Sequence, residues 1–171
     1  MEILWSPWRS KYIQGFKDEK PSDIEKVCFF CEATDYPERA KELLVVERRE
    51  LCFAMLNRYP YNNGHLMVAP FRHIGNLDEL TDEELVAMMK LVKSSVKALD
   101  THCKPHGYNI GINMGRVSGA GVPGHIHIHI VPRWNGDTSF ISVLSDTKVV
   151  SQSIEETQEQ LSAIFNNHIG K

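Results

Sequence analysis

The sequence lacks the features of a membrane or exported protein. It contains no run of about 18 consecutive apolar residues, the length expected of a membrane-spanning helix. Residues 1–9 carry neither the basic segment nor the small-residue cleavage site of a secretory signal. Acidic and basic residues nearly balance, 22 against 19, so the formal net charge is only −3. That balance argues against a general nucleic-acid or membrane-surface binder, and we expect a cytoplasmic protein.

Cysteine is also scarce. Four cysteines in 171 residues do not make a disulfide framework in a chain of this length without an export signal. Two of them form the pair Cys28-x-x-Cys31, which fits half of a zinc site, a redox pair or a chance spacing. A redox pair of this kind normally follows a strand and lies at the start of a helix. Here a polar segment precedes and Glu-Ala-Thr-Asp follows, so we favour Zn²⁺ bound with two further ligands.

What the chain does have is an alternation of histidine and isoleucine in residues 124–132. The strand period of two places His125, His127 and His129 on one face and the isoleucines on the other. The first and last imidazoles then lie about 13 Å apart along the strand, too far to share one metal ion. Burying three imidazoles without a task is costly, so we interpret this face as functional.

The central imidazole, His127, suits covalent phosphoryl chemistry. A neutral imidazole can attack phosphorus and divide one difficult displacement into two easier ones. Its other ring nitrogen must then donate a hydrogen bond, commonly to a backbone carbonyl. Neighbouring imidazoles can hold the developing negative charge. An alternative hypothesis is a zinc hydrolase that uses His125 and His127 as a ligand pair, with a third ligand and an open position.

Hydrophobic periodicity predicts an α+β fold: an antiparallel sheet of about five strands with one long helix packed on it, plus a C-terminal helix. The strands are expected at 44–47, 51–56, 65–69, 107–113 and the histidine segment, and a short helix at 36–43. Thr81 and Glu84 form a capping box at the start of the long helix. Its core face is predicted to comprise Leu85, Met88, Met89, Val92, Val96 and Leu99.

Three segments divide the chain. Residues 1–27 form an N-terminal extension, and we expect Trp5 and Trp8 to pack on the body of the protein or on a dimer partner. Residues 28–135 form the catalytic domain. Residues 136–171 form a C-terminal extension, expected to be extended over 139–150 and helical over 153–165, with Ser153 and Glu156 as the cap.

A glycine-rich loop leads into the histidine segment. Residues 115–124 include four glycines, which let backbone N–H groups approach an anion closely. A loop of this kind is often a plain connection. Because it runs directly into the histidines, we interpret it as a phosphate cradle.

Residues 125–131, His-Ile-His-Ile-His-Ile-Val, resemble the signature of the histidine triad (HIT) superfamily of nucleotide hydrolases and transferases. Other family features follow in order within residues 28–135: the Cys28/Cys31 pair, Asn57, Gly64-His65, Pro70-x-x-His73, the long helix, Asn113 and the glycine-rich loop. Residues 5–9 (Trp-Ser-Pro-Trp-Arg) and 132–140 (Pro-Arg-Trp-x-Gly-Asp-x-x-Phe) resemble a bacterial branch that cleaves diadenosine polyphosphates, which includes diadenosine tetraphosphate phosphorylases.

The resemblance implies a role for each matching residue. His127 matches the nucleophile, His129 and His65 match residues that contact the phosphates, and Asn57 matches the residue that holds the ribose hydroxyls. With a glycine loop one residue longer than usual, Asn113 matches an Asn or Gln near the phosphates. The ligands of a closed, structural Zn²⁺ site match Cys28, Cys31, His73 and His125. The resemblance also implies adenine dinucleotide substrates, Mg²⁺ carried on the polyphosphate, and a homodimer in which the N-terminal and C-terminal segments are candidate contacts.

The chain departs from the family pattern at Gly121-Val122, where many relatives carry Gln-Ser or Gln-Thr. Backbone amides of the loop around Gly119 and Gly121, or the side chains of Arg116 and Ser118, are the candidate replacements. This leaves open whether water or inorganic phosphate accepts the nucleotidyl group. Two alternatives remain besides the zinc hydrolase: a nucleoside phosphoramidase of the same superfamily and a nucleotide-binding sensor with weak activity.

Overall fold

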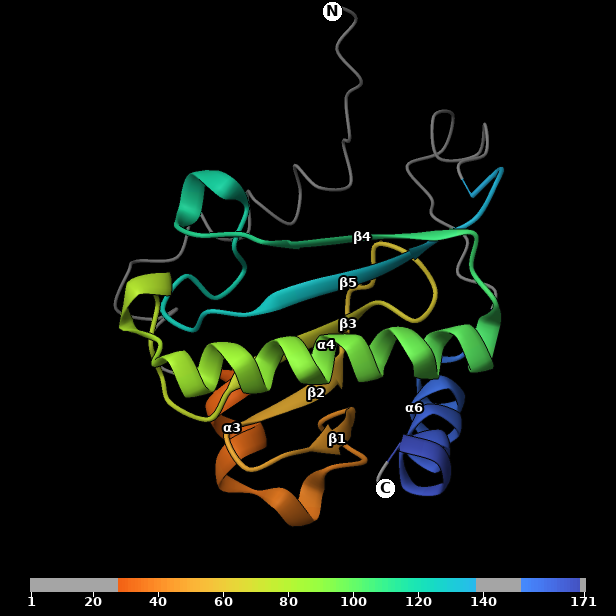
Figure 1. The fold of residues 1–171 in the computed structure, drawn as a ribbon, viewed down its shortest axis with the longest axis horizontal. Helices are drawn as coiled ribbons and strands as arrows, with labels where there is room; N and C mark the ends of the chain where they lie inside the picture. Colours follow the sequence, from red (N-terminus) through yellow and green to blue (C-terminus); the bar gives the residue numbers. More distant parts are fainter. Residues whose placement is uncertain (1–27, 138–151, 170–171) are drawn as a thin grey trace, which may run out of the picture.

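The computed structural model describes residues 28–137 and 152–169. Its centre is a five-stranded antiparallel sheet in the order β1-β2-β3-β5-β4 (Figure 1). The strands are β1 Val45–Arg48, β2 Cys52–Leu56, β3 Leu66–Pro70, β4 Gly107–Ile112 and β5 Ile128–Arg133. The helices are α3 Phe29–Asp35, α4 Asp82–Cys103 and α6 Ile154–Ile164. The predicted α+β arrangement is confirmed.

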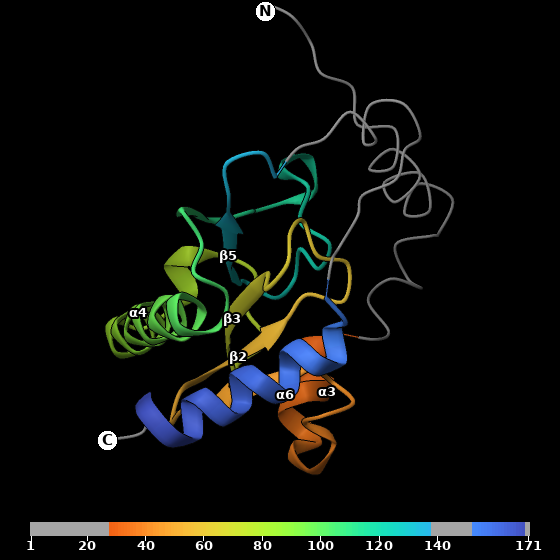
Figure 2. The same cartoon turned by 90° about the vertical axis from the view of Figure 1, so that its right-hand side faces the viewer.

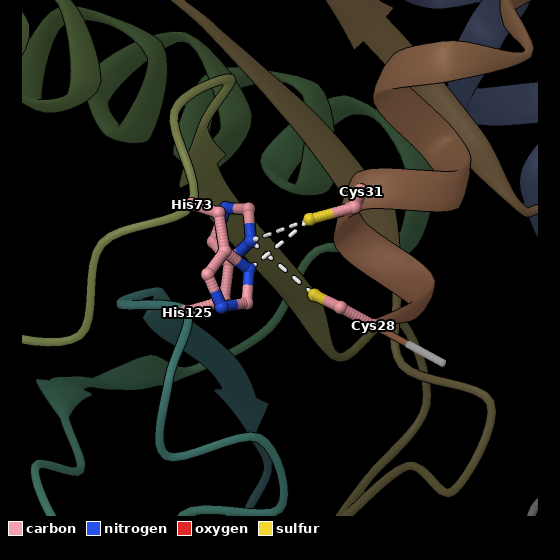
Figure 3. A group of neighbouring side chains, drawn as sticks. All are labelled: Cys28, Cys31, His73 and His125. Carbon is pink, nitrogen blue, oxygen red and sulfur yellow. Dashed lines mark hydrogen bonds between the residues drawn. The ribbon is translucent and has the colours of Figure 1, made fainter. Parts of the chain in front are cut away.

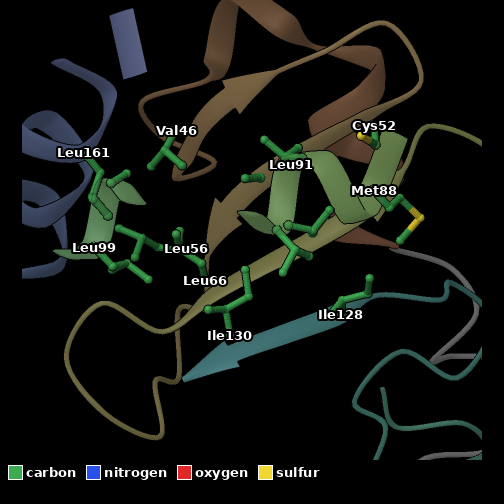
Figure 4. Close-up of a cluster of buried hydrophobic side chains, with 14 of the residues drawn as sticks. Val46, Cys52, Leu56, Leu66, Met88, Leu91, Leu99, Ile128, Ile130 and Leu161 are labelled. Carbon is green, nitrogen blue, oxygen red and sulfur yellow. The ribbon is translucent and has the colours of Figure 1, made fainter. Parts of the chain in front are cut away.

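The two faces of the sheet carry different structures. Figure 2 shows α4 on one side of the strands and α3 on the other. The core beneath α4 takes the isoleucines of the histidine segment, together with aliphatic residues of α4 and the other strands (Figure 4). A second, smaller core lies under α3 and is built around Phe30, Phe53 and Met67. The imidazoles of the histidine segment lie on this second face, because side chains alternate along the chain.

The histidine segment is only partly strand. The β5 ladder begins at Ile128, opposite Val68, so His125 and His127 precede it and the prediction of a strand over the whole segment is wrong. Instead, the backbone N–H of Ile126 donates to the carbonyl of Ile74 over 2.7 Å, beyond the end of β3. The alternation nevertheless persists, because Ile126, Ile128 and Ile130 all lie in the core under α4.

The helices differ from the predictions in three places. Helix α3, which begins directly after Cys28, was not expected, and the helix expected at 36–43 is reduced to one short turn, Pro37–Arg39. Met89 is 55% exposed, so its assignment to the core face is wrong. The buried row of α4 runs through Met88, and the next residue is rotated by about 100° around the helix.

The C-terminal helix was predicted correctly. The hydroxyl of Ser153 accepts a hydrogen bond from the backbone N–H of Glu156 at 3.2 Å, and Leu161 and Phe165 are buried in the main core. Gln158 donates to the carbonyl of Val45 in β1 over 2.8 Å. The helix therefore packs on its own chain. Residues 1–27 and 139–150 lie outside the described part, so the expectations for them stay predictions.

No helix in the described ranges combines the length and apolarity that crossing a membrane requires.

The start of α4 is held by a buried carboxylate. Glu84, 5% exposed, accepts the backbone N–H of Thr81 at 2.9 Å and completes the predicted capping box. Both of its oxygens also accept from the guanidinium of Arg72, at 2.7 and 2.6 Å. Arg72 lies just after β3, so this ion pair ties the helix start to the sheet. The hydrogen bond from Arg72 lowers the pKa of Glu84.

Replacing Glu84 with Gln should therefore lower the free energy of unfolding by about 1–2 kcal/mol near neutral pH. Because the folded-state pKa is depressed, this contribution is complete above the unfolded carboxyl pKa of about 4.3 and is lost as the pH falls through the folded-state value. Urea unfolding of both proteins across this range measures it. Asp82→Asn, on an exposed residue of the same first turn, is the matched control. A pH-independent difference would contradict the ion-pair interpretation.

Candidate active site and metal centre

The ring of His127 lies at the centre of the site and is only 3% exposed. Its Nδ1 lies 2.8 Å from the carbonyl oxygen of His125. A carbonyl can only accept, so Nδ1 carries the hydrogen and Nε2 is left with its lone pair. Burial lowers the pKa of His127, and the bond to the carbonyl opposes this only in part. The ring is therefore held neutral, in the tautomer that a nucleophile requires.

A second pair of imidazoles lies beside it. The backbone N–H of Tyr61 donates to Nδ1 of His65 at 3.1 Å, so the hydrogen of the neutral ring is on Nε2. That nitrogen lies 3.0 Å from Nδ1 of His129 and donates to it. The hydrogen of His129 is then on Nε2. The ring centroids of His127 and His129 are 4.6 Å apart and the two rings meet nearly at right angles, so the two imidazoles are direct neighbours in the site.

Two asparagines complete the group. Nδ2 of Asn57 lies 3.4 Å from Nδ1 of His65 and can donate to it, and Nδ2 of Asn113 lies 3.5 Å from Nε2 of His129. Because Nε2 of His129 carries hydrogen, the Asn113 amide must turn its oxygen toward that nitrogen to bond with it. The structure thus brings together five of the residues expected at the nucleotide site: His127, His129, His65, Asn57 and Asn113. Neutral donors next to a free lone pair are the elements needed to receive a phosphoryl group and stabilise its oxygens.

Four potential metal ligands converge at the start of α3 (Figure 3). One donor atom from each of Cys28, Cys31, His73 and His125 lies within 4.8 Å of the others. Nδ1 of His73 is 3.1 Å from the Cys31 sulfur, and Nδ1 of His125 is 3.3 and 3.7 Å from the two sulfurs. A tetrahedral zinc ion would space its sulfur and nitrogen ligands by roughly 3.5 Å. The four residues therefore fit a closed Cys2His2 site.

The surroundings of these ligands also favour a cation. Nε2 of His125 donates to the carbonyl of Pro70 at 2.9 Å, which leaves Nδ1 unprotonated and facing the sulfurs. Burial, and after it the neighbouring Cys28, raise the pKa of Cys31 to about 12. A divalent ion would reverse this, since metal binding displaces the thiol proton.

The structure also revises the argument about the cysteine pair. A helix does open at Cys28, so the expected absence of a helix was wrong and cannot argue against a redox pair. The position of His73 and His125 is what favours a metal. The metal-capable group found among the described residues includes His125 and not His127. Because His125 directs Nδ1 to the cysteines, it is not paired with His127 as the zinc-hydrolase alternative required.

The glycine-rich loop forms hydrogen bonds within itself. The hydroxyl of Ser118 donates to the carbonyl of Gly115 at 2.7 Å, and the backbone N–H of Gly119 donates to Arg116 at 3.1 Å. Gly115 and Gly119 have φ angles of +73° and +86°, which L-residues with side chains rarely adopt. A Cβ on Gly124 would lie 3.2 Å from the ring of His73, so the loop end approaches the metal ligands closely.

Comparison of the chain with known proteins shows the family to which it belongs. A sequence model of the HIT domain matches residues 38–136. The chain is 36% identical over 163 residues to a protein named AP-4-A phosphorylase from Mycobacterium tuberculosis, covering 94% of this chain and 83% of that one. The chain belongs to the HIT family. It is also 30% identical over 121 residues to the asymmetrical bis(5'-nucleosyl)-tetraphosphatase of Schizosaccharomyces pombe, covering 71% of this chain and 63% of the relative.

The HIT fold is shared with solved structures. A zinc-bound histidine triad family protein from Mycobacterium smegmatis aligns with a TM-score of 0.66 at 26% identity, covering 84% of this chain and 96% of that one. Zinc is bound in that structure, whereas the fit of the four ligands found here rests on their own geometry.

Sequence reasoning missed two residues of the HIT site. Phe30, fully buried, packs 5.0 Å from the ring of His125 and 4.7 Å from that of His127. Its position inside the cysteine pair was a signal, since both ligands would draw it to the histidine segment. Tyr61 contributes a backbone N–H and a ring 4.7 Å from His65. No sequence pattern identifies a backbone donor of this kind, because its direction depends on the loop conformation.

Proposed function

We propose that this protein cleaves dinucleoside polyphosphates such as diadenosine tetraphosphate at the α-phosphate, through a nucleotidyl intermediate on His127. The observation that carries the proposal is the tautomer of His127, which leaves the lone pair on Nε2, in a ring that neighbours the ring of His129. The names of the two relatives, a phosphorylase and an asymmetrical tetraphosphatase, support the substrate class.

The first step is attack by Nε2 of His127 on the α-phosphorus. A P–N bond forms, the P–O bond to the remaining nucleotide breaks, and the leaving oxygen takes the electron pair. Nδ1 keeps its hydrogen bond to the carbonyl of His125, which stabilises the positive charge on the ring. The N–H of His129, backed by His65, donates to a phosphoryl oxygen.

In the second step, water or inorganic phosphate attacks the same phosphorus and frees His127. Asn57 binds the ribose hydroxyls. Asn113 and the loop residues Arg116, Ser118, Gly119 and Gly121 contact the phosphates, with backbone N–H groups in place of the family's polar pair. Mg²⁺ accompanies the polyphosphate substrate and has no ligand set of its own in this proposal. The expected cytoplasmic location and the absence of a nucleic-acid partner stay predictions.

Product analysis with and without phosphate tests this proposal and identifies the acceptor. ADP with ATP appearing only when phosphate is present means a phosphorylase, and AMP with ATP in plain buffer means an asymmetrical hydrolase. His127→Ala should lower kcat by at least about a hundredfold, equivalent to ~2.7 kcal/mol in the barrier. A loss of less than about tenfold, ~1.4 kcal/mol, would rule out the covalent role.

Two further measurements separate the alternatives. A nucleoside phosphoramidase would turn over an adenosine phosphoramidate faster than the dinucleotide. A nucleotide-binding sensor would bind adenosine nucleotides without a burst of nucleotidyl-enzyme. Either result would contradict the proposed substrate class while leaving the site geometry unchanged.

We also propose that Cys28, Cys31, His73 and His125 bind a structural zinc ion. The ion takes no part in the chemical steps. It joins the start of α3 to the loop after β3 and to the residue preceding Ile126, so it holds Phe30 and the carbonyl of His125 against His127.

Metal analysis of protein purified without chelator should give about one zinc per chain, as a closed four-ligand site binds tightly. Cys31→Ser should lose most of the zinc and lower the melting temperature. Cys103→Ser, which changes a cysteine outside the cluster, should keep it. Intact, folded protein without zinc would contradict the proposal.

The homodimer implied by the family remains a proposal, and the structure offers a surface for it. In the described part of the chain, β4 pairs with β5 on one side and is the last strand of the sheet. Ile110 and Ile112 are 48% and 36% exposed on it. An exposed apolar edge readily pairs with another strand, and antiparallel pairing of two copies satisfies a two-fold axis.

If two copies pair along β4, Ile110→Glu should convert the dimer to a monomer, because it places a charge on the apolar edge that the two copies would bury. Sedimentation velocity at micromolar concentration measures this. Tyr36→Glu, at 48% exposure on the segment leading into β1 at the opposite sheet edge, should leave the dimer intact. A wild-type protein that sediments as a monomer would contradict the homodimer.

A further inference from the structure

The loop between β2 and β3, residues 57–65, positions the second imidazole pair. Within it, the backbone N–H of Tyr61 donates to Nδ1 of His65 at 3.1 Å. The backbone N–H of His65 in turn donates to the carbonyl of Asn62 at 3.2 Å. Nδ1 of His65 is thus held as an acceptor by the N–H of Tyr61, with the Asn57 amide nitrogen further away at 3.4 Å. The closer of these two donors, and with it the hydrogen position on His65 and His129, depends on where this loop places the N–H of Tyr61.

One side chain attaches the loop to the rest of the site. The amide nitrogen of Asn62 donates to the carbonyl of Pro132 in β5 at 3.0 Å and to a carboxylate oxygen of Asp137 at 2.9 Å. Asn62 is the residue directly after Tyr61. Both hydrogens of its amide are used to bind the end of the strand that carries His129.

Asp137 is itself firmly held. Its side chain is 9% exposed, and it accepts from Arg133 at 2.5 and 3.0 Å and from the backbone N–H of Trp134 at 3.2 Å. The hydrogen bond from Arg133 holds the pKa of Asp137 well below its usual range. Arg133 also donates to Asn109 of β4 at 2.7 Å. The carboxylate is therefore a fixed anion that links the two strands to the loop.

We infer that Asn62 and Asp137 are positioning residues for the reaction: they hold the 57–65 loop so that the N–H of Tyr61 keeps His65 and His129 in the tautomer that donates to the phosphate. Neither residue contacts His65 or His129 through its side chain in the hydrogen bonds described above. They act through the backbone of the loop. The inference rests on the proposed function for its effect on rate, but the tautomer itself does not.

Breaking the hydrogen bonds of Asn62 to Pro132 and Asp137 should let the ring of His65 turn or exchange tautomers. If the hydrogen of His65 moves to Nδ1, its Nε2 becomes an acceptor, and His129 must then donate to it from Nδ1. The Nε2 of His129 would lose its hydrogen and present a lone pair to the phosphate oxygen. The donor that stabilises the transition state would be replaced by a repulsive contact, so kcat should fall more than KM rises.

The test combines kinetics with imidazole NMR of the full-length, zinc-loaded protein. Asn62→Ala should reduce kcat/KM for diadenosine tetraphosphate by about tenfold or more, a part of the loss seen when a direct donor is removed. Long-range ¹H–¹⁵N spectra should show His65 and His129 with hydrogen on Nε2 in the unmodified protein and a mixture in the variant. The double variant Asn62→Ala/Asp137→Ala should be no slower than the slower single variant, because both substitutions break the same hydrogen bond between Asn62 and Asp137.

Asn109→Ala is the matched control, since it removes a hydrogen bond from the same Arg133 on the side away from the loop, and it should stay within twofold of the unmodified protein. Asp137→Asn, which keeps the side-chain size, gives the same test if Asn62→Ala does not fold. Asn62→Ala activity within twofold, or lost activity with unchanged tautomers, overturns the inference. Absence of dinucleotide cleavage by the unmodified protein would instead count against the proposed function, and the NMR result would still decide the positioning role.

Discussion

The site depends on His125, a fully buried residue whose polar groups each hold a different part of the molecule. Nδ1 faces the two cysteine sulfurs, Nε2 donates to the carbonyl of Pro70, and the carbonyl oxygen accepts from Nδ1 of His127. A buried imidazole with an unpaired nitrogen would be costly. Because both ring nitrogens of His125 need partners, the orientation of its ring and the position of its backbone are fixed. The backbone carbonyl in turn determines which nitrogen of His127 carries hydrogen.

The remaining imidazoles follow the same physical rule. A neutral imidazole has one donor and one acceptor nitrogen, so each neighbour that can only donate or only accept decides the next tautomer. The carbonyl of His125 does this for His127, and the backbone N–H of Tyr61 does it for His65 and then His129. The two series of hydrogen bonds end on neighbouring rings, His127 and His129, whose centroids are 4.6 Å apart. One ring is left with a lone pair and the other with an N–H, and the proposed attack on phosphorus uses both.

Much of this molecule could be predicted from short patterns. The capping box at Thr81 and Glu84, the cap at Ser153, and the period of two in the histidine segment are local rules, and the structure contains each of them. Helix α3 was missed because its seven residues are stabilised by Phe30 and Ala33 packing into the second core rather than by a marked helical periodicity. Met89 was wrongly assigned to the core because the apolar residues in the sequence span a wider sector of the helix surface than the sector that the sheet covers.

Local sequence was sufficient to place three imidazoles on one face and to single out the middle one, because side-chain alternation is a property of an extended backbone itself. It could not decide which nitrogen of each ring carries hydrogen. Some of the groups responsible are distant in the chain, since His125 meets Pro70 across 55 residues and His65 meets His129 across 64, and the nearby ones depend on how the backbone turns. Only the packing of the folded sheet and its loops brings these donors and acceptors together, and it is this packing that makes three similar histidines chemically different.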